Sequence, residues 1–138
     1  MSEELRPDVL RAVRRIEDER GTLAMVECGI DIDFPIRRVY WLSDLTPTHP
    51  RGFHAHRALR QFAVCVAGGC RIVLEYPSGK REEIALHAGG GGVAIGPMVW
   101  REMHDFTPDC VLLVLADQPH DECDYLRTRE EWKKACGG

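Results

Sequence analysis

From Thr22 onward the chain is a succession of short strand-like segments, each followed by a turn rich in glycine or proline. The segments Phe62–Val66 and Arg71–Tyr76 flank a Gly68-Gly69 turn, and Cys110–Ala116 is the most apolar run in the chain. Short runs of β-forming residues between turn signals are typical of sandwiches and barrels. The pattern predicts an all-β fold with Cys110–Ala116 as a buried central strand.

Helical patterns occur only at the two ends of the chain. Residues 1–17 place apolar side chains among arginines at a spacing that suits an amphipathic helix. The tail Asp121–Ala135 is charged and helix-competent, and Asp121 is a candidate N-cap. We therefore expect a barrel or sandwich with a short C-terminal helix.

Length and composition predict one domain spanning residues 1–138. A net charge of -4 gives no reason to expect nucleic acid as a partner. No window approaches the ~20 apolar residues of a membrane span, and the first residues, Met1–Glu4, are acidic where a signal peptide is basic. We expect a cytoplasmic protein without a membrane partner.

The six cysteines predict reduced thiols and no structural metal. Cys65, Cys70 and Cys110 lie in or beside strand-like apolar runs, where a free thiol behaves as a small hydrophobic group. A C-x-x-C pair, the usual sign of a structural zinc site, is absent from the sequence.

Two of the six histidines form the sequence His54-Ala55-His56, a few residues before Gln61. Side chains alternate between the faces of a strand, so both imidazoles point to one side and Ala55 to the other. Apolar core positions rarely hold two titratable rings. The pair is a candidate functional site, suited both to binding a metal and to transferring protons.

The histidine pair, the polar Gln61 and the following glycine turn resemble the first motif of the cupin barrel. Metal-binding cupins carry Glu at the position of Gln61 and a third His at the position of Glu102, with His104 two residues further on. A neutral amide is a weak ligand, so we expect no metal. Two alternatives stay open: an Fe(II) dioxygenase with the imidazoles and a carboxylate as ligands, and a non-catalytic cupin that binds a sugar or nucleotide.

Seven ordered blocks make the resemblance more specific. They are Ile36–Trp41, Arg51–His56, Gln61, Gly96–Met103, Asp105-Phe106, Cys110–Ala116 and Asp121–Arg127. Together they resemble the dTDP-4-keto-6-deoxyglucose 3,4-ketoisomerases, the WxcM-like sugar isomerases of the cupin superfamily, from about Asp18 to Trp132. The resemblance implies an RmlC-like jelly-roll barrel.

The resemblance also implies an isomerase that needs neither metal nor cofactor. It moves a keto group from C4 to C3 of a dTDP-linked deoxysugar through an enediol(ate), without net redox change. Imidazole suits proton transfer at neutral pH. We expect His56 to act as the base at C3 and C4, His54 as its partner, and Tyr40 as a donor to the developing oxyanion.

The substrate-binding residues implied by the resemblance are mostly cationic. Arg51 and Arg38 are expected to bind the diphosphate, Gln61 to hydrogen-bond an imidazole, and Trp100 and Glu102 to line the pocket. Arg20 and Arg101 occupy two positions that differ between gluco- and galacto-type relatives. This chain has one residue of each type, so the resemblance does not decide the product configuration.

The resemblance changes the expectation for the N-terminus. In relatives the segment at about 8–16 is an edge strand exchanged with a partner subunit, so Val9–Val13 is expected to be extended rather than helical. A homodimer is expected for the same reason. Pro119-His120 replaces a common Tyr pair, so no ligand contact is assigned to that corner, and His120 is taken as structural.

Overall fold

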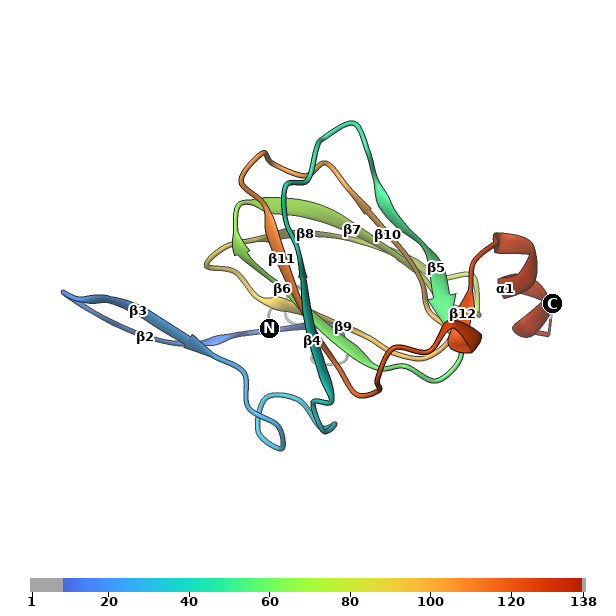
Figure 1. Cartoon of the computed structure of the whole chain (residues 1–138), viewed down its shortest axis with the longest axis horizontal. Coiled ribbons are helices and arrows are strands. Elements are labelled where there is room, and N and C mark those ends of the chain that lie inside the picture. The colour runs from blue at the N-terminus through green and yellow to red at the C-terminus, as the bar shows by residue number, and fades with distance from the viewer. Residues whose placement is uncertain (1–8, 138) are drawn as a thin grey trace.

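The computed structural model describes residues 9–137, which form two five-stranded antiparallel sheets and a separate hairpin (Figure 1). The first sheet has the order β1 (Leu10–Arg11), β9 (Gly92–Ile95), β6 (Gln61–Ala67), β11 (Val111–Ala116) and β4 (Arg38–Leu42). The second has the order β12 (Tyr125–Leu126), β5 (Arg51–His56), β10 (Trp100–His104), β7 (Gly69–Glu75) and β8 (Arg81–His87). The hairpin pairs β2 (Arg14–Asp18) with β3 (Gly21–Met25), and the helical elements are η1 (Glu122–Asp124) and α1 (Arg129–Ala135). The all-β prediction with a short C-terminal helix is confirmed.

The core lies between the two sheets because alternate side chains of each strand point inward. The largest buried apolar cluster includes Ala63 and Cys65 from the first sheet and Ile72 and Leu74 from the second. A second cluster lies on the other face of the first sheet, between β6, β11 and the segment 26–36. The strand Val111–Ala116 pairs on both sides, with β4 and β6, as predicted for a central strand.

The pairing of β5 with β10 decides which residues share a face with the histidines. Arg101 lies directly opposite His54, so the two side chains project from the same face. The register shifts between Arg101 and Glu102, next to Gly52 on β5. Gly52 has φ +90, and an added Cβ would lie 3.0 Å from the Arg101 carbonyl oxygen, so this irregularity requires glycine.

The N-terminal segment is extended where the structure describes it, since β1 and β2 replace the amphipathic helix suggested by spacing. Residues 1–8 lie outside the described part. β1 pairs with β9 of its own chain, and the β2–β3 hairpin projects away from the barrel (Figure 1). Pairing of β1 with a sheet edge outweighs its helical spacing.

The C-terminal tail is less helical than its composition suggests. Asp121 caps only the single turn η1, accepting a hydrogen bond from the Cys123 amide. The chain then extends as β12 against β5 before α1 begins, capped by a reciprocal Thr128–Glu131 capping box. In residues 9–137 no helix has the length and apolar character needed to cross a bilayer.

Candidate active site

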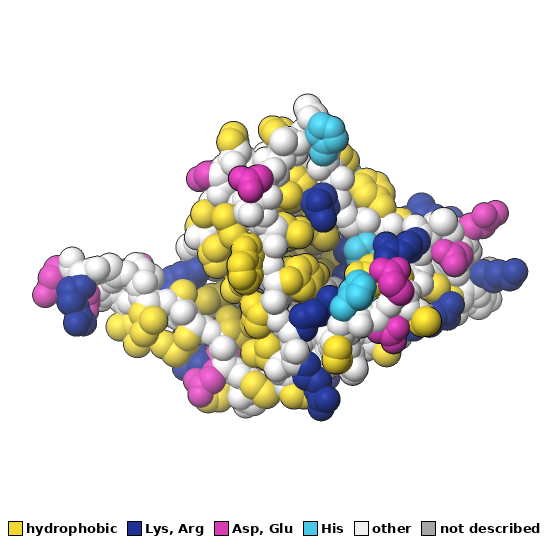
Figure 2. Space-filling view, viewed as in Figure 1, with side chains coloured by type: hydrophobic (Ala, Val, Ile, Leu, Met, Phe, Trp, Pro, Cys, Tyr) yellow, Lys and Arg dark blue, Asp and Glu magenta, His cyan; other side chains and the backbone are white. Residues whose placement is uncertain are grey.

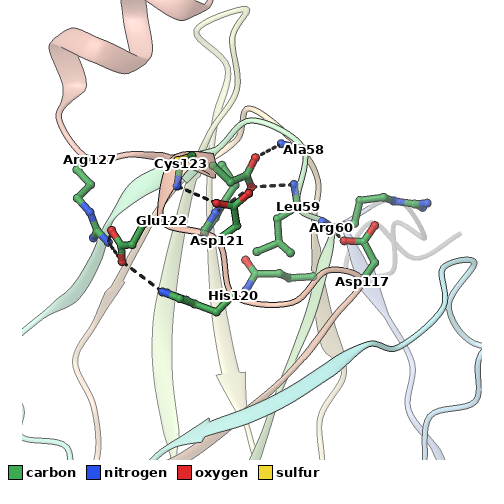
Figure 3. A network of polar contacts seen from close by, with 12 residues as sticks. Ala58, Leu59, Arg60, Asp117, His120, Asp121, Glu122, Cys123 and Arg127 are labelled. Carbon is green, nitrogen blue, oxygen red and sulfur yellow. Dashed lines mark hydrogen bonds and ion pairs between the residues drawn. The ribbon is translucent and has the colours of Figure 1, made fainter.

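A cavity of about 320 Å³ opens where β4, β5 and the 117–124 connection meet. This connection is hydrogen-bonded to the turn between β5 and β6: Asp117 Oδ1 accepts a 2.9 Å hydrogen bond from the Arg60 amide (Figure 3). The cavity is lined by Arg38, His56, Ala58, Leu59, Gln118, Pro119, His120, Asp121, Asp124 and Tyr125.

The two imidazoles lie together beside this cavity, as strand alternation predicts. The ring centroids of His54 and His56 are 4.9 Å apart, and Tyr125 on β12 packs against both, at 5.0 and 4.3 Å. Ala55 points to the other face and is fully buried with Trp100 and other apolar side chains. The pairing of β12 with β5 thus places the Tyr125 ring against the histidine pair.

In each imidazole the Nδ1 atom lies near an oxygen acceptor. His54 Nδ1 lies 3.1 Å from the Gly52 carbonyl oxygen, which accepts only, so Nδ1 carries the proton and Nε2 the lone pair. His56 Nδ1 lies 3.3 Å from Asp124 Oδ2 but makes no well-aligned hydrogen bond. The Asp124 carboxylate is itself held by the amides of Ala58 and Leu59, at 2.9 and 3.2 Å (Figure 3).

A buried guanidinium dominates the electrostatics of the site. Arg101 is 2% exposed and donates hydrogen bonds to neutral acceptors, Gln61 Oε1 and the Val99 carbonyl oxygen. Burial lowers its pKa to about 10, so it stays charged at neutral pH. Burial, followed by the charge of Arg101, lowers the pKa of His54 to about 4 and that of His56 to about 2. Both imidazoles are therefore neutral at pH 7, and each has a lone pair on one ring nitrogen.

Gln61 links the guanidinium to a phenol and does not contact an imidazole. Its Nε2 donates to Tyr40 Oη at 2.7 Å while its Oε1 accepts from Arg101. The prediction that Gln61 hydrogen-bonds an imidazole is corrected, although the residue does belong to the site network. Burial raises the pKa of Tyr40, which keeps its hydroxyl protonated and able to donate.

Trp100 and Glu102 are not brought to the histidine pair. Successive residues of β10 alternate, so Arg101 faces the imidazoles while Trp100, Glu102 and His104 face the opposite side. There Glu102 accepts hydrogen bonds from Trp100 Nε1 and lies against His104 Nε2, both at 2.9 Å. An iron triad that uses Glu102 or His104 with the imidazole pair does not fit this arrangement.

The four arginines predicted to bind substrate occupy different places. Arg38 lines the cavity, with its guanidinium 5.1 Å from the Tyr40 ring centroid, and Arg101 lies opposite His54 in the pairing of β10 with β5. Arg51 is exposed at the start of β5. Arg20 stands at the tip of the projecting hairpin, where it pairs with Asp18 and does not approach this chain's own site (Figure 1).

The connection from β11 to β12 supplies site residues that the sequence reasoning missed. Asp124 and Tyr125 contact the imidazoles directly, and His120, taken as structural, lines the cavity. The matching block Asp121–Arg127 was the available signal, but its helix-competent composition concealed the two-residue strand that carries Tyr125.

The cysteines are free thiols in the structure. Cys65 Sγ lies 3.9 Å from both Cys70 Sγ and Cys110 Sγ, and this buried trio is the one cluster within residues 9–137 with metal-ligand spacing. The hydrogen bond between Cys65 and Cys70, together with burial, raises the pKa of Cys65, and burial raises that of Cys110 to about 12. Cys65 and Cys110 are therefore protonated core thiols at neutral pH.

Comparison with known proteins agrees with this geometry. Residues 8–137 match the FdtA family, described as WxcM-like, C-terminal. The chain belongs to this family. It is 45% identical over 121 residues to the TDP-4-oxo-6-deoxy-alpha-D-glucose-3,4-oxoisomerase of Aneurinibacillus thermoaerophilus, covering 88% of this chain and 86% of that protein.

Solved structures of sugar isomerases share the fold. The 3,4-ketoisomerase QdtA of Thermoanaerobacterium thermosaccharolyticum, in complex with TDP, is 40% identical with a TM-score of 0.88, covering 94% of this chain and 95% of that one. A 3,4-ketoisomerase from Helicobacter canadensis is 34% identical with a TM-score of 0.89, covering 94% and 96%. A histidine-to-asparagine variant of QdtA, in complex with TDP-4-keto-6-deoxyglucose, is 38% identical with a TM-score of 0.88, covering 96% of each chain.

Proposed function

We propose that this protein is a 3,4-ketoisomerase that converts dTDP-4-keto-6-deoxyglucose into a dTDP-3-keto-6-deoxyhexose. The observation that carries the proposal is the neutral pair His54 and His56 beside the buried cation Arg101, at the edge of a cavity. Family membership and a relative with TDP-4-keto-6-deoxyglucose bound support the substrate class.

The reaction requires groups that remove a proton from one carbon and return one to the next, and the imidazole pair can serve in both steps. A proton leaves C3 of the sugar, an enediol(ate) forms across C3 and C4, and a proton returns at C4. His56 is the base at these carbons because it lines the cavity, and Asp124 near its Nδ1 favours Nε2 as the reacting atom. His54, whose Nε2 carries a lone pair, relays protons to and from the sugar oxygens.

Arg101 stabilises the enediolate. Arg101 is buried and donates its hydrogen bonds to the neutral acceptors Gln61 Oε1 and the Val99 carbonyl oxygen, so its charge is screened less than that of an exposed arginine. Negative charge that develops on the sugar oxygens is stabilised by this preorganised field. Tyr40, tied to Arg101 through Gln61, donates its hydroxyl proton to the same oxygens.

The diphosphate is bound at the cavity mouth. Arg38 lines the cavity, and its Nε is a buried polar atom without a hydrogen-bond partner among residues 9–137. Unpartnered buried donors are costly, so a ligand that supplies acceptors gains affinity there. Arg38 offers its guanidinium to the diphosphate, and the exposed Arg51 adds a second cation.

We further propose that the active form is a cytoplasmic homodimer of single cupin domains. Five large apolar side chains stay exposed on the hairpin and on the first sheet: Ile16, Leu23, Val39, Trp41 and Val66. Figure 2 shows apolar side chains at the surface of the hairpin and of the barrel. A second copy would cover these faces. With the 8–16 segment exchanged, the hairpin of one copy brings Arg20 to the active site of the other. Free thiols at all six cysteines agree with a reducing compartment.

The activity is tested by incubating the protein with dTDP-4-keto-6-deoxyglucose in D2O and following the sugar by NMR. The proposal predicts a 3-keto product with deuterium at the former C4 carbonyl carbon. A parallel incubation in H2O leaves a proton at C4, and its coupling to H5 reports gluco or galacto configuration. Unchanged substrate, or turnover that requires added iron, contradicts it.

The dimer is tested by light scattering of the wild type and of Trp41→Glu, which places a charge on the exposed sheet face. A dimer that dissociates in the variant supports the proposed interface. A monomeric wild type refutes it.

A further inference from the structure

A third imidazole stands at the mouth of the cavity, outside the proposed proton-transfer pair. His120 lies in the connection between β11 and η1 and lines the cavity together with Arg38 and His56. Its Nδ1 is 3.5 Å from Arg38 Nη1. Its Nε2 is 3.3 Å from Glu122 Oε2, and Figure 3 shows this contact. Its ring also lies 5.8 Å from the Tyr125 ring, the aromatic side chain that packs on both catalytic imidazoles.

The neighbours of His120 fix its tautomer. A guanidinium only donates hydrogen bonds, so Nδ1 must present its lone pair to Arg38. A carboxylate only accepts, so Nε2 carries the proton toward Glu122. Glu122 is ionised, because the side chain of Arg127 donates to both its oxygens, at 2.7 and 2.8 Å, and lowers its pKa. The neutral Nε2–H form therefore bridges Arg38 and Glu122.

This bridge sets the direction of the Arg38 guanidinium. One face of the guanidinium lies near the Tyr40 ring, 5.1 Å from its centroid, and Nη1 points to His120. The Nε atom is buried and has no hydrogen-bond partner within residues 9–137. Because Arg38 lines the cavity, a fixed Nη1 limits the orientations in which its other donors can meet an anionic oxygen there.

We propose that His120 is a positioning residue that holds Arg38 for the diphosphate of the nucleotide sugar. This role rests on the proposed isomerase function, and it acts on binding of the nucleotide rather than on the proton transfer. Hydrogen-bond donors and acceptors alternate along the chain Arg127–Glu122–His120–Arg38, so the exposed ion pair at one end orders the cavity-lining cation at the other. An ordered guanidinium loses less conformational entropy when the ligand binds.

The test compares four variants with the wild type: H120F, H120N, R38M and the double variant R38M/H120F. Phenylalanine keeps a ring but removes both nitrogen atoms, whereas the amide oxygen of asparagine takes the place of Nδ1. H120F is expected to raise KM for the keto sugar, and Kd for dTDP measured by calorimetry, about tenfold, with kcat within about twofold. H120N is expected to return both constants to within about threefold of wild type.

The double variant separates positioning from direct contact. If His120 acts through Arg38, adding H120F to R38M changes Kd for dTDP by less than about twofold. A further tenfold weakening in that background, a wild-type Kd in H120F, or an H120N variant as weak as H120F overturns the inference. His87→Phe, at an exposed histidine on β8, is the matched control and is expected to bind dTDP like wild type.

The outcomes also separate this inference from the proposed function. A wild type that binds dTDP without converting the keto sugar refutes the isomerase activity, while the Kd comparison still decides the role of His120. A wild type that does not bind dTDP overturns both. H120A, which deletes the ring, repeats the test if H120F does not fold, and it is expected to weaken dTDP binding equally.

Discussion

The depressed pKa of the imidazoles predicts activity well into the acid range. His54 has a pKa of about 4, against 6.5 for an ordinary histidine. At pH 5.5 about 97% of imidazoles with the lower value are neutral, but only about 9% of those with the ordinary value. We therefore expect kcat/KM for dTDP-4-keto-6-deoxyglucose to fall less than twofold between pH 7.5 and 5.5, measured with NMR detection of the 3-keto product.

The lowered pKa of His54 also makes the stability of the fold depend on pH, so folding must be measured beside activity. The folded-state pKa of His54 lies below its unfolded value, so its contribution to stability is present above pH 6.5 and is lost as the pH falls toward 4. Circular dichroism at each pH establishes that the protein is folded. Arg101→Met removes the second cause of both shifts, and its acid limb is expected to move to higher pH. An acid limb near pH 6.5 in folded wild type, or an unmoved limb in the variant, refutes the reasoning.

Three further predictions concern the buried cation, the outer face of β5 and the thiols. Arg101→Met is expected to lower kcat about 10²- to 10³-fold, as for the loss of one oxyanion donor, and a loss below tenfold in a steady-state assay contradicts its role. Ala55 has 0% exposure, so Ala55→Leu places a larger side chain where there is no free space. It is expected to lower the free energy of unfolding, measured by urea titration, by about 1–3 kcal/mol, and an unchanged value contradicts the packing. Iodoacetamide is expected to modify the exposed Cys28 and Cys123 long before the three core cysteines, and equal labelling rates by mass spectrometry oppose the structure.

The histidine pair was predictable because it depends only on local alternation. Once the segment His54-Ala55-His56 is a strand, both imidazoles must share a face, and the structure places them 4.9 Å apart. The barrel was predictable for a similar reason, since short β-rich runs and glycine turns recur along the sequence. Both inferences use information within a few residues.

The sequence does not show which residues of β10 face the histidine pair, because this depends on how β10 pairs with another strand. Alternation puts Trp100 and Glu102 on one side and Arg101 on the other, but it does not say which side faces the imidazoles. The register that sets Arg101 opposite His54 decides it. The wrong choice placed Trp100 and Glu102 in the pocket, although both lie on the other face of the sheet.

The connection that carries Asp124 and Tyr125 was missed for the same physical reason. Its sequence is charged and helix-competent, yet tertiary pairing draws Tyr125 into a two-residue strand beside His56. Long-range contacts of this kind leave little local pattern. Only the resemblance of the block Asp121–Arg127 pointed to the segment.

The most direct test of the account is the His56→Asn variant, studied with the keto sugar and with dTDP. Asparagine keeps a polar group of similar position but accepts no proton at neutral pH. The account predicts at least a thousandfold loss of kcat with dTDP binding within about threefold of wild type. Turnover within tenfold of wild type would contradict the assignment of His56 as the base that moves the proton between C3 and C4.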